Sequence, residues 1–509
     1  MRDYTLKTKT NKILTKDQNE IVEKLLENDF FFNCAQTGFG KTYSTLTAAI
    51  HKILERKEDD IHFALLLPGS AVKAFTDTFK KDFGIAYNIF TATKTQTQPN
   101  ARFHIFNYST VGKDFTREGL KNNYYFQTLK KLKLKHKNLW LIADEAHALQ
   151  NENTIQYQMV YHMRPWFIGM WFLTATPILN DLDGFFRMVT LIQPNFSHGN
   201  IHAFRNKYMI SEKDYIWVTK GGSRKKITTS RVVGYQNLDI LQQRFSEISI
   251  IKSKHYDVEY IFRSALLTPA NLAFYKRAAE GIFSGTRLKS GKLRKKQNHN
   301  AARLHDLQRV VSNSHPQFEV LTDKRQLTEK ELLLISTVKE VFDKNEATLI
   351  YFSYIETLER VKYILNVLKD KLGIKAIFEI SGSVSTEVRK KVEKAITPKS
   401  VVLITSAGTE SVNLQKANNL IFYEIPFALR QFIQACGRIT RMDSLYDKFY
   451  VYTLEAEGTI DTYKKNRIVA NSVPIKNIVG GSNLLPTELL PVSLEDIELM
   501  KDELLWMKT

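Results

Sequence analysis

Short apolar runs recur along the first part of the chain, and several of them end directly in polar residues. The runs at 63–67, 139–143 and 169–173 contain no charged residue. Runs of this length are typical of strands that are buried on both faces of a parallel sheet. Residues 1–197 therefore predict one α/β lobe, whose functional loops lie at the carboxyl ends of its strands.

A second series of strand and helix patterns begins near residue 330. Apolar-rich runs predict strands, and the longer amphipathic segments at 354–368 and 429–439 predict helices. We expect a second α/β lobe over 329–470 and a C-terminal tail over 471–509. The predicted strands of the second lobe are 347–352, 376–380, 401–405 and 419–423.

Between the two lobes the composition shifts toward basic residues. Cations cluster at 224–226 and at 287–296, and helical patterns cover 236–247 and 268–281. Residues 198–328 therefore predict a mainly helical insertion with exposed basic loops.

The charge balance of the chain points to a polyanionic partner. The 509 residues include 73 Lys and Arg against 53 Asp and Glu, a formal charge of +20. Nucleic acid is the first candidate for such a partner, and a merely soluble basic protein is the alternative. The two cysteines exclude a disulfide framework and a cysteine-rich zinc module. No signal peptide or membrane segment is expected, since no apolar run approaches about 18 residues.

Residues 35–42 read AQTGFGKT and lie between an apolar run and a helical pattern. This is the strand–loop–helix context of a phosphate-binding loop, in which glycines let backbone N–H groups turn toward an anion. The lysine would reach the outer phosphates, and the threonine hydroxyl would hold Mg²⁺. Ala35 occupies the position where a first glycine is usual. The predicted nucleotide-binding residues here are Thr37, Gly38, Phe39, Gly40, Lys41 and Thr42.

Two carboxylates, Asp144 and Glu145, follow the apolar run at 139–143. Asp144 would hold Mg²⁺ from the side opposite the phosphate loop, and Glu145 would polarise the attacking water. A helix N-cap at Asp144 is the alternative, and it explains one carboxylate but not the pair.

Two arginines, Arg438 and Arg441, lie in the second predicted lobe. At a spacing of three residues they share one face of a helix. A guanidinium supplied across a cleft stabilises the charge that develops in phosphoryl transfer. A solvated basic helix is the alternative.

With these motifs the chain resembles the superfamily 2 helicases and translocases, and within them the Snf2-like group, over most of residues 10–465. The sequence departs from the Snf2-like pattern at Ala175 and Ser411, where glycine is common in that group. The matching segments are Gln18 (Q motif), 35–42 (motif I), 66–70 (Ia), 144–147 (II, in its DEAH form), 174–180 (III, with the Pro-Ile-x-Asn extension), 351–353 (IV), 406–414 (V) and 434–441 (VI).

The resemblance implies two RecA-like lobes in tandem with ATP bound between them. It implies that Gln18 recognises adenine and that Gln434, Arg438 and Arg441 complete the catalytic site. The residues implied to couple this site to the nucleic-acid groove are His147, Thr174 and Thr176.

The resemblance also implies contacts to nucleic-acid backbone, because a translocase cannot depend on sequence. Hydroxyls, backbone amides and cations at strand ends suit this role, although each serine or threonine taken alone could be an ordinary cap. The candidates are Ser70, Lys73, Ser109, Thr110, Ser381, Gly382, Arg389, Thr405 and Ser406.

We therefore expect an ATP- and Mg²⁺-dependent DNA helicase or translocase acting on duplex or branched DNA in branch migration, remodelling, recombination or replication. A compact phage or viral version, or a bacterial one, is expected, monomeric and in the bacterial or infected-host cytoplasm. The alternatives are the motor subunit of a restriction, transcription-termination or defence complex, and an RNA helicase.

Overall fold

The structure is a computed structural model that forms two compact units, built mainly from residues 1–254 and 255–473. We call them unit 1 and unit 2 and describe each by itself. The described residues are 3–36, 38–56, 59–111, 123–178, 181–220, 223–253, 256–284, 300–312, 327–406, 414–440 and 444–475.

Unit 1 is built on an eight-stranded sheet in the order β10-β1-β7-β6-β2-β5-β3-β4. All neighbouring strands pair in parallel except β3 and β4, which are antiparallel. The strands are β1 (Phe30–Asn33), β2 (Ile61–Leu67), β3 (Tyr87–Thr91), β4 (Lys94–Gln96), β5 (Phe103–Asn107), β6 (Asn138–Asp144), β7 (Gly169–Leu173) and β10 (Ser249–Ile250).

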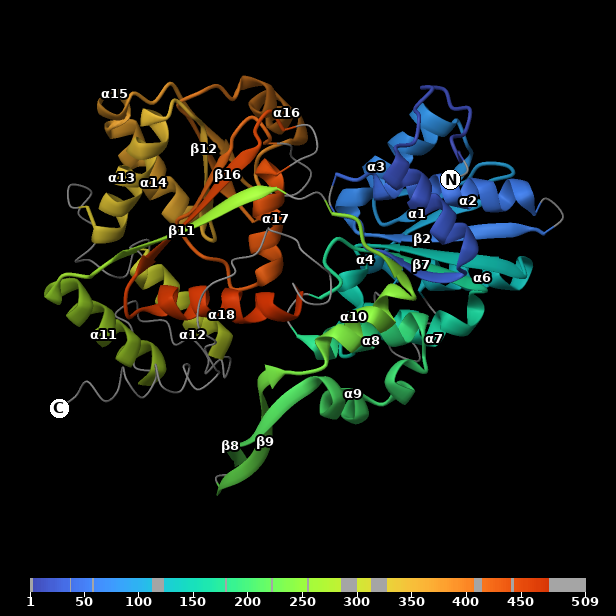
Figure 1. Ribbon diagram of the computed structural model, residues 1–509, viewed down its shortest axis with the longest axis horizontal. Helices are drawn as coiled ribbons and strands as arrows, with labels where there is room; N and C mark the ends of the chain where they lie inside the picture. Colours follow the sequence, from blue (N-terminus) through green and yellow to red (C-terminus); the bar gives the residue numbers. More distant parts are fainter. Residues whose placement is uncertain are drawn as a thin grey trace. The chain divides into compact units, whose positions relative to one another are not determined.

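Helices cover both faces of this sheet, as a parallel sheet requires. In Figure 1, α1, α2 and α3 lie on one side of the strands, and α7, α8 and α10 lie on the other. The helices of unit 1 are α1 (Lys16–Glu27), α2 (Lys41–Glu55), α3 (Gly69–Asp77), α4 (Tyr108–Val111), α6 (Tyr124–Lys135), α7 (Ile155–Met163), α8 (Leu182–Ile192), α9 (Ile201–Tyr208) and α10 (Leu238–Ser246).

Unit 2 is built on a six-stranded, all-parallel sheet in the order β11-β16-β15-β12-β14-β13. Its strands are β11 (Asp257–Ala265), β12 (Thr348–Phe352), β13 (Ala376–Ile380), β14 (Ser400–Thr405), β15 (Asn419–Phe422) and β16 (Lys448–Ala456). Its helices are α11 (Pro269–Ser284), α12 (Asn300–Val311), α13 (Glu329–Asp343), α14 (Ile355–Val367), α15 (Lys369–Leu372), α16 (Thr386–Ala395), α17 (Leu429–Ile439) and α18 (Ile460–Ile475).

The predicted fold class is confirmed, because both lobes are parallel α/β units. The segment predicted as a mainly helical insertion, 198–328, is more varied than expected. It contributes an edge strand to each sheet, with β10 beside β1 and β11 beside β16. These strands were not predicted because β10 has only two residues and β11 carries charges along its length.

The same segment also forms an antiparallel hairpin of β8 (Met209–Lys220) and β9 (Ser223–Tyr235). The basic run at 224–226 therefore lies on a strand, where the sequence had predicted a loop. Cations interrupt the β-branched and aromatic residues of this stretch and so mask its strand pattern. The second predicted basic run, 287–296, lies outside the described residues.

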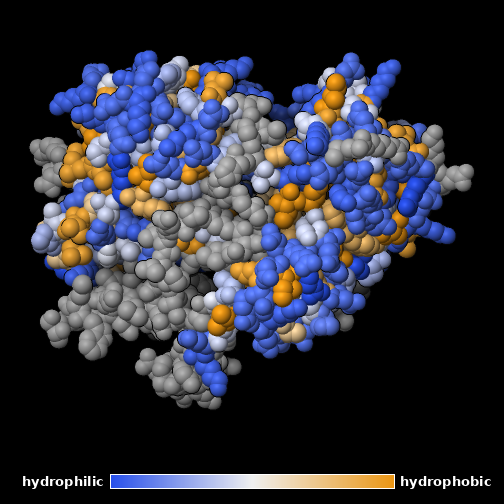
Figure 2. All heavy atoms as spheres, viewed as in Figure 1, coloured by the Kyte–Doolittle hydropathy of each residue, from blue (hydrophilic) through white to orange (hydrophobic). Residues whose placement is uncertain are grey.

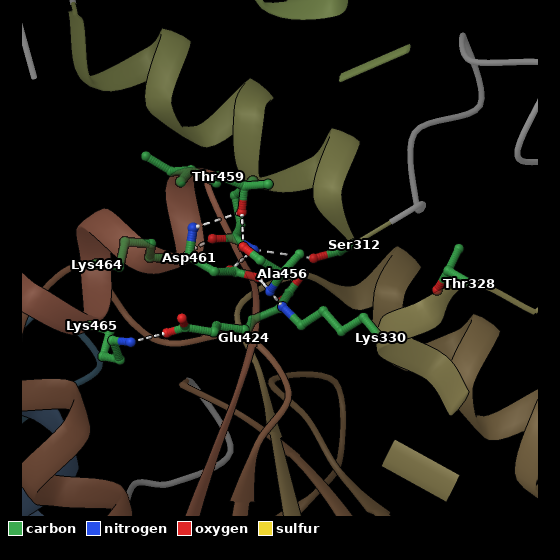
Figure 3. A network of polar contacts seen from close by, with 12 residues as sticks. Ser312, Thr328, Lys330, Glu424, Ala456, Thr459, Asp461, Lys464 and Lys465 are labelled. Atoms are coloured by element: carbon green, nitrogen blue, oxygen red, sulfur yellow. Dashed lines mark hydrogen bonds and ion pairs between the residues drawn. The ribbon is translucent and has the colours of Figure 1, made fainter. Parts of the chain in front are cut away.

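A buried polar network ties α18 to the rest of unit 2 (Figure 3). Lys330 Nζ lies 2.6 Å from Asp461 Oδ2, and both side chains are almost completely buried. Gln308 donates to Asp461 Oδ1 at 2.9 Å and accepts from Lys464 Nζ at 2.7 Å. Burial lowers the pKa of Lys464 to about 7. Removing one partner would leave a buried charge uncompensated, so this network fixes where α18 begins.

Charged and polar residues cover much of the face of the molecule shown in Figure 2, including the outer surface of α13 and α14. Leu332 on α13 and Tyr363 and Val367 on α14 are exposed apolar side chains. Among the described residues, no helix combines the length and the apolar character needed to cross a bilayer.

A directional chain of hydrogen bonds links β2, β5 and β3, three adjacent strands toward the β4 edge of the unit 1 sheet. The backbone N–H of Gln98 donates to Asn88 Oδ1 at 2.7 Å, so Asn88 Nδ2 faces His104 Nδ1 at 3.0 Å. His104 must then carry its proton on Nε2, and it donates to His62 Nδ1 at 2.9 Å. Burial lowers the pKa of His62 and lowers that of His104 to about 3.

This chain predicts that unit 1 loses stability in acid. His104 has a pKa of 6.5 in the unfolded chain and of about 3 in the folded chain. Between these two pH values the unfolded chain therefore binds a proton that the folded chain does not. The free energy of unfolding should therefore decrease as the pH is lowered. His104→Gln should make this decrease between pH 7 and pH 5 smaller by about 2 kcal/mol. Urea unfolding followed by tryptophan fluorescence measures this, since four of the five tryptophans lie in residues 1–254. An exposed-histidine control, His202→Gln, should keep the wild-type slope; equal slopes in all three proteins would contradict the assignment.

Candidate nucleotide-hydrolysis site

The phosphate loop connects β1 to α2 at the carboxyl edge of the unit 1 sheet. Gly38 and Gly40 have φ angles of 96° and 76°, in the left-handed region that favours glycine. A Cβ atom at Gly40 would also come within 2.5 Å of Gln18 Nε2. The left-handed backbone favours glycine at position 40, and a larger residue there would also have to displace the Gln18 amide. Thr37, the remaining residue of the predicted loop, lies outside the described residues.

Lys41 opens α2 and turns back toward the loop. Its Nζ donates to the carbonyl of Ala35 at 2.6 Å. Ala35 is fully buried, and its own N–H donates to Asn33 Oδ1 at 3.2 Å. Its φ is not in the left-handed region, so this structure does not need glycine where the usual motif has it. Thr42 follows in the first turn, half-buried, where the helix N-terminus favours an anion.

Gln18 holds the phosphate loop from the start of α1. Its Nε2 donates to Phe39 O at 3.0 Å, while its Oε1 accepts from the N–H of Thr15 at 3.0 Å. The Thr15 hydroxyl in turn accepts from Gln18 N, which completes a capping box. Both ends of this amide are therefore used within the chain, one to cap α1 and one to fix the loop.

The acidic pair stands at the end of β6, at the same edge of the sheet as the phosphate loop, since Asn33 and Asp144 both pair with Leu173 of β7. Burial and the neighbouring Glu145 raise the pKa of Asp144, and Lys41 opposes that rise. Glu145 has a φ of 51°, which is unusual for a residue other than glycine. Such backbone conformations concentrate at functional sites. The Tyr108 hydroxyl, which sequence reasoning missed, donates to Asp144 O at 3.1 Å and ties this turn to α4.

The three predicted coupling residues lie together behind the acidic pair. His147 Nδ1 is 3.1 Å from Glu145 Oε2 and 3.4 Å from Thr174 Oγ1. Thr174 Oγ1 also accepts from Thr176 N at 3.1 Å. A continuous polar path therefore joins Glu145 to the turn after β7. Residues 179 and 180, which end the predicted Pro-Ile-x-Asn extension, lie outside the described residues.

In unit 2, α17 carries the predicted arginine motif. Gln434 and Arg438 are both half-buried and lie four residues apart, so they share a helix face. The opposite face packs Phe432, Cys436 and Ile439 into the core. Arg441 lies outside the described residues, as does 407–413, which contains most of motif V.

The chain matches two protein families. The DEAD/DEAH box helicase family matches residues 15–185, and the helicase conserved C-terminal domain family matches residues 329–443. Together these matches span more than half of the 509 residues. The chain belongs to the superfamily 2 helicases.

Two curated relatives are similar to this helicase. The uncharacterized ATP-dependent helicase YqhH of Bacillus subtilis is 23% identical over 379 residues, which is 70% of this chain and 62% of the relative. This chain thus spans less than two thirds of that relative. A protein of Methanocaldococcus jannaschii, provisionally named an ATP-dependent RNA helicase, is 33% identical over 138 residues, or 25% of this chain and 17% of the relative.

Among solved structures, the helicase is similar to the SWI2/SNF2 ATPase core of Sulfolobus solfataricus. The core in complex with dsDNA is 18% identical with a TM-score of 0.39, and the match covers 94% of this chain and 95% of that one. The core domain alone is 19% identical with a TM-score of 0.38, covering 95% and 92%. At these scores the likeness supports no statement about the partner of this chain.

The predicted nucleic-acid contacts of unit 1 differ in exposure. Ser70 and Lys73 are solvent-accessible on α3, and Ser109 is exposed at the start of α4. Thr110 is buried, and its hydroxyl donates to Asn107 O at 2.9 Å. Three of the four positions can therefore be reached by a polyanion.

The predicted contacts of unit 2 cluster after β13 and β14. Gly382 is exposed, but Ser381 is buried and donates to Glu379 Oε1 at 2.8 Å. Arg389 Nη2 donates to Ser381 O at 2.8 Å and so braces the same turn. Thr405 is buried and Ser406 is half-buried at the end of β14.

Glu424 is a functional-site candidate that sequence reasoning missed. Its carboxylate accepts from the N–H groups of Ser353 and Tyr354 at 2.7 and 3.2 Å, and from Thr357 Oγ1 at 2.9 Å. It thereby caps α14 from a neighbouring strand and fixes the motif IV turn. Burial raises its pKa. Its acidic character directly after an apolar strand was the available signal.

One other cluster in the helicase has the donor atoms of a metal site. Among the described residues, Asp60, His62 and His136 bring their donor atoms within 4.8 Å of one another. A metal-bound histidine normally donates its second ring N–H, whereas His62 Nδ1 accepts from His104. His62 Nε2 therefore carries the proton and donates to Asp60 Oδ1 at 3.0 Å. The cluster is satisfied by hydrogen bonds and serves to fix the start of β2.

The role of Gln18 in holding the phosphate loop can be tested by separating its two hydrogen bonds. Gln18→Glu keeps an oxygen acceptor for the cap at Thr15 but replaces the donor to Phe39 O with a repulsive oxygen. We expect an unchanged unfolding midpoint and a rise of about tenfold in the KM for ATP, corresponding to a contact of ~1.4 kcal/mol. Gln18→Ala should lose the cap as well and lower the midpoint. A wild-type KM for Gln18→Glu would show that the loop does not depend on this bond.

Proposed function

We propose that this helicase is a DNA-dependent ATPase of the Snf2-like group that translocates on duplex or branched DNA. The observation that carries the proposal is that the phosphate loop after β1 and the acidic pair at the end of β6 lie at the same edge of the unit 1 sheet, since Asn33 and Asp144 both pair with Leu173 of β7. The Pro177-Ile178 dipeptide of motif III supports the Snf2-like assignment by sequence resemblance.

In this proposal the phosphate loop binds the triphosphate of ATP. Lys41 exchanges the Ala35 carbonyl for the outer phosphates, and the N–H groups at the start of α2, from Gly40 to Thr42, face the anion. The hydroxyl of Thr42 and the carboxylate of Asp144 are the hard oxygen donors that Mg²⁺ prefers. When bound, Mg²⁺ neutralises charge on the phosphates. A cation also relieves the cost of a buried Asp144 carboxylate next to Glu145.

Glu145 is the residue that orients and polarises the attacking water. Its left-handed backbone turns it away from the strand, and His147 contacts its carboxylate. His147 and Thr174 then relay a change at Glu145 to the turn after β7. This path is the proposed link between hydrolysis and movement on nucleic acid.

Unit 2 supplies the charge that completes catalysis. Arg438 and Arg441, with Gln434 on the same helix, stabilise the negative charge that develops on the transferred phosphoryl group. ATP binding would draw the units together and hydrolysis would release them, which moves one unit along the strand.

DNA is proposed as the substrate because of the net charge of +20 and the accessible predicted contacts. Ser70, Lys73, Ser109 and Gly382 offer a hydroxyl, a cation or a backbone amide. None of these groups reads base sequence, as a translocase requires.

An RNA helicase is the second candidate. It is favoured by the Methanocaldococcus jannaschii relative, which carries that name and has the higher identity of the two curated relatives, over a shorter segment. In either case the chain could serve as the motor subunit of a larger restriction, termination or defence complex.

The proposal predicts that hydrolysis and nucleic-acid binding can be separated. Lys41→Ala and Glu145→Gln should each lower ATP turnover by at least about 10²-fold, because one removes a phosphate contact and the other the water-polarising group. Both variants should bind labelled duplex DNA like the wild type. Steady-state phosphate release and fluorescence anisotropy measure the two properties. Glu27→Gln, at a surface ion pair with Lys24, is the matched control. Wild-type turnover in either site variant would overturn the assignment.

A further inference from the structure

Helix α6 of unit 1 has one face on the core and one face in solvent. Leu129 is almost completely buried, and the ring centroids of Phe126 and Trp166 lie 5.4 Å apart. Five of the six residues on the opposite side of the helix are exposed, and the sixth is half-buried. From the helical period, the outer face of α6 consists of Tyr124, Gln127, Lys130, Lys131, Leu134 and Lys135.

The outer face of α6 is cationic and has no carboxylate near it in sequence. It carries Lys130, Lys131 and Lys135, and residues 124–137 contain neither Asp nor Glu. Within the part of the chain that the structure describes, these three lysines make no hydrogen bond or ion pair. Lysines on α1 and α14, by contrast, pair with a glutamate three residues away. Because Lys131 and Lys135 are one turn apart, their like charges destabilise the helix, and a bound anion would relieve that repulsion.

The start of α6 is fixed beside the predicted nucleic-acid contacts of unit 1. Asn123 caps α6 by accepting from two N–H groups of its first turn at 3.0 and 3.1 Å. Its Nδ2 also donates to the carbonyls of Thr110 and Val111 at 3.2 and 3.0 Å. These residues belong to α4, on which Ser109 is exposed. Lys130 lies about 10 Å further along the axis of α6, at about 1.5 Å per residue.

A phosphate backbone fits the chemistry of this face better than a membrane does. A helix that binds a bilayer lays its apolar face into the lipid. The apolar face of α6 packs against its own unit, and Leu134 is the one aliphatic residue of the outer face. Lysine side chains neutralise phosphates without reading base sequence.

We infer that the outer face of α6 binds the phosphate backbone of duplex DNA, next to the contacts predicted at Ser109. The inference rests on the proposed function, since it adds a contact surface for the same substrate. It assigns to α6 a share of the binding that depends on salt, because each lysine that meets a phosphate releases counterions from the DNA.

The test combines Lys130→Gln, Lys131→Gln and Lys135→Gln in the full-length protein. Glutamine matches lysine in helix propensity, so the unfolding midpoint should not fall. Each lost phosphate contact lowers the dependence of log K on log salt by about 0.9, so the slope for a labelled duplex should shrink by about 2 to 3. Affinity at about 0.1 M salt should fall at least about tenfold. Arginine at the same three positions keeps the charge and should keep the wild-type slope.

The matched control combines Lys7→Gln, Lys9→Gln and Lys94→Gln, at three exposed lysines of unit 1 outside α6. It removes the same charge, so long-range electrostatics change equally, and the slope should shrink by less than about 1. A wild-type slope in the α6 variant, or equal slopes in the α6 variant and the control, would overturn the inference. So would an α6 variant that loses binding to anionic phospholipid vesicles and keeps its affinity for the duplex.

The same experiment separates the inference from the proposed function. If the α6 variant binds duplex DNA like the wild type and the DNA still stimulates its ATP hydrolysis, the inference fails and the proposed function stands. If the wild-type protein binds no DNA, both fail.

Discussion

The nucleotide chemistry of unit 1 depends on how the chain turns between β1 and α2. The turn has a left-handed backbone at Gly40, and a side chain at that position would have to displace the Gln18 amide. The same amide holds the Phe39 carbonyl, and Lys41 holds the Ala35 carbonyl. These two contacts fix the backbone of the loop by hydrogen bonds within unit 1.

In unit 2 a side chain also fixes a turn at the end of a strand, but there the side chain is a carboxylate that accepts from backbone N–H groups. Its parallel sheet also ends in a polar turn, but the anchor there is the buried Glu424 carboxylate, which collects the N–H groups at the start of α14. Each unit therefore fixes one polar turn at the carboxyl end of a strand with a side chain from another segment of the same unit.

The sequence predicts the central strands of each sheet better than its edge strands. Strands β2, β6 and β7 are buried on both faces, so their apolar runs are continuous and were predicted. Edge strands such as β10 and β11 are short or charged and depend on a neighbour far away in sequence. The loop and acidic motifs were visible as local patterns. The contacts of Gln18 with Phe39 and of Tyr108 with Asp144 join distant segments, and local patterns do not encode them.

The central claim is that hydrolysis at the unit 1 site is coupled to DNA. The most direct measurement is the rate of ATP hydrolysis with saturating duplex DNA, branched DNA, single-stranded DNA and RNA, compared with no nucleic acid. Duplex or branched DNA should raise turnover at least about tenfold, because the proposed translocation couples each round of hydrolysis to bound DNA. Stimulation by RNA alone, or equal rates in all conditions, would contradict the account.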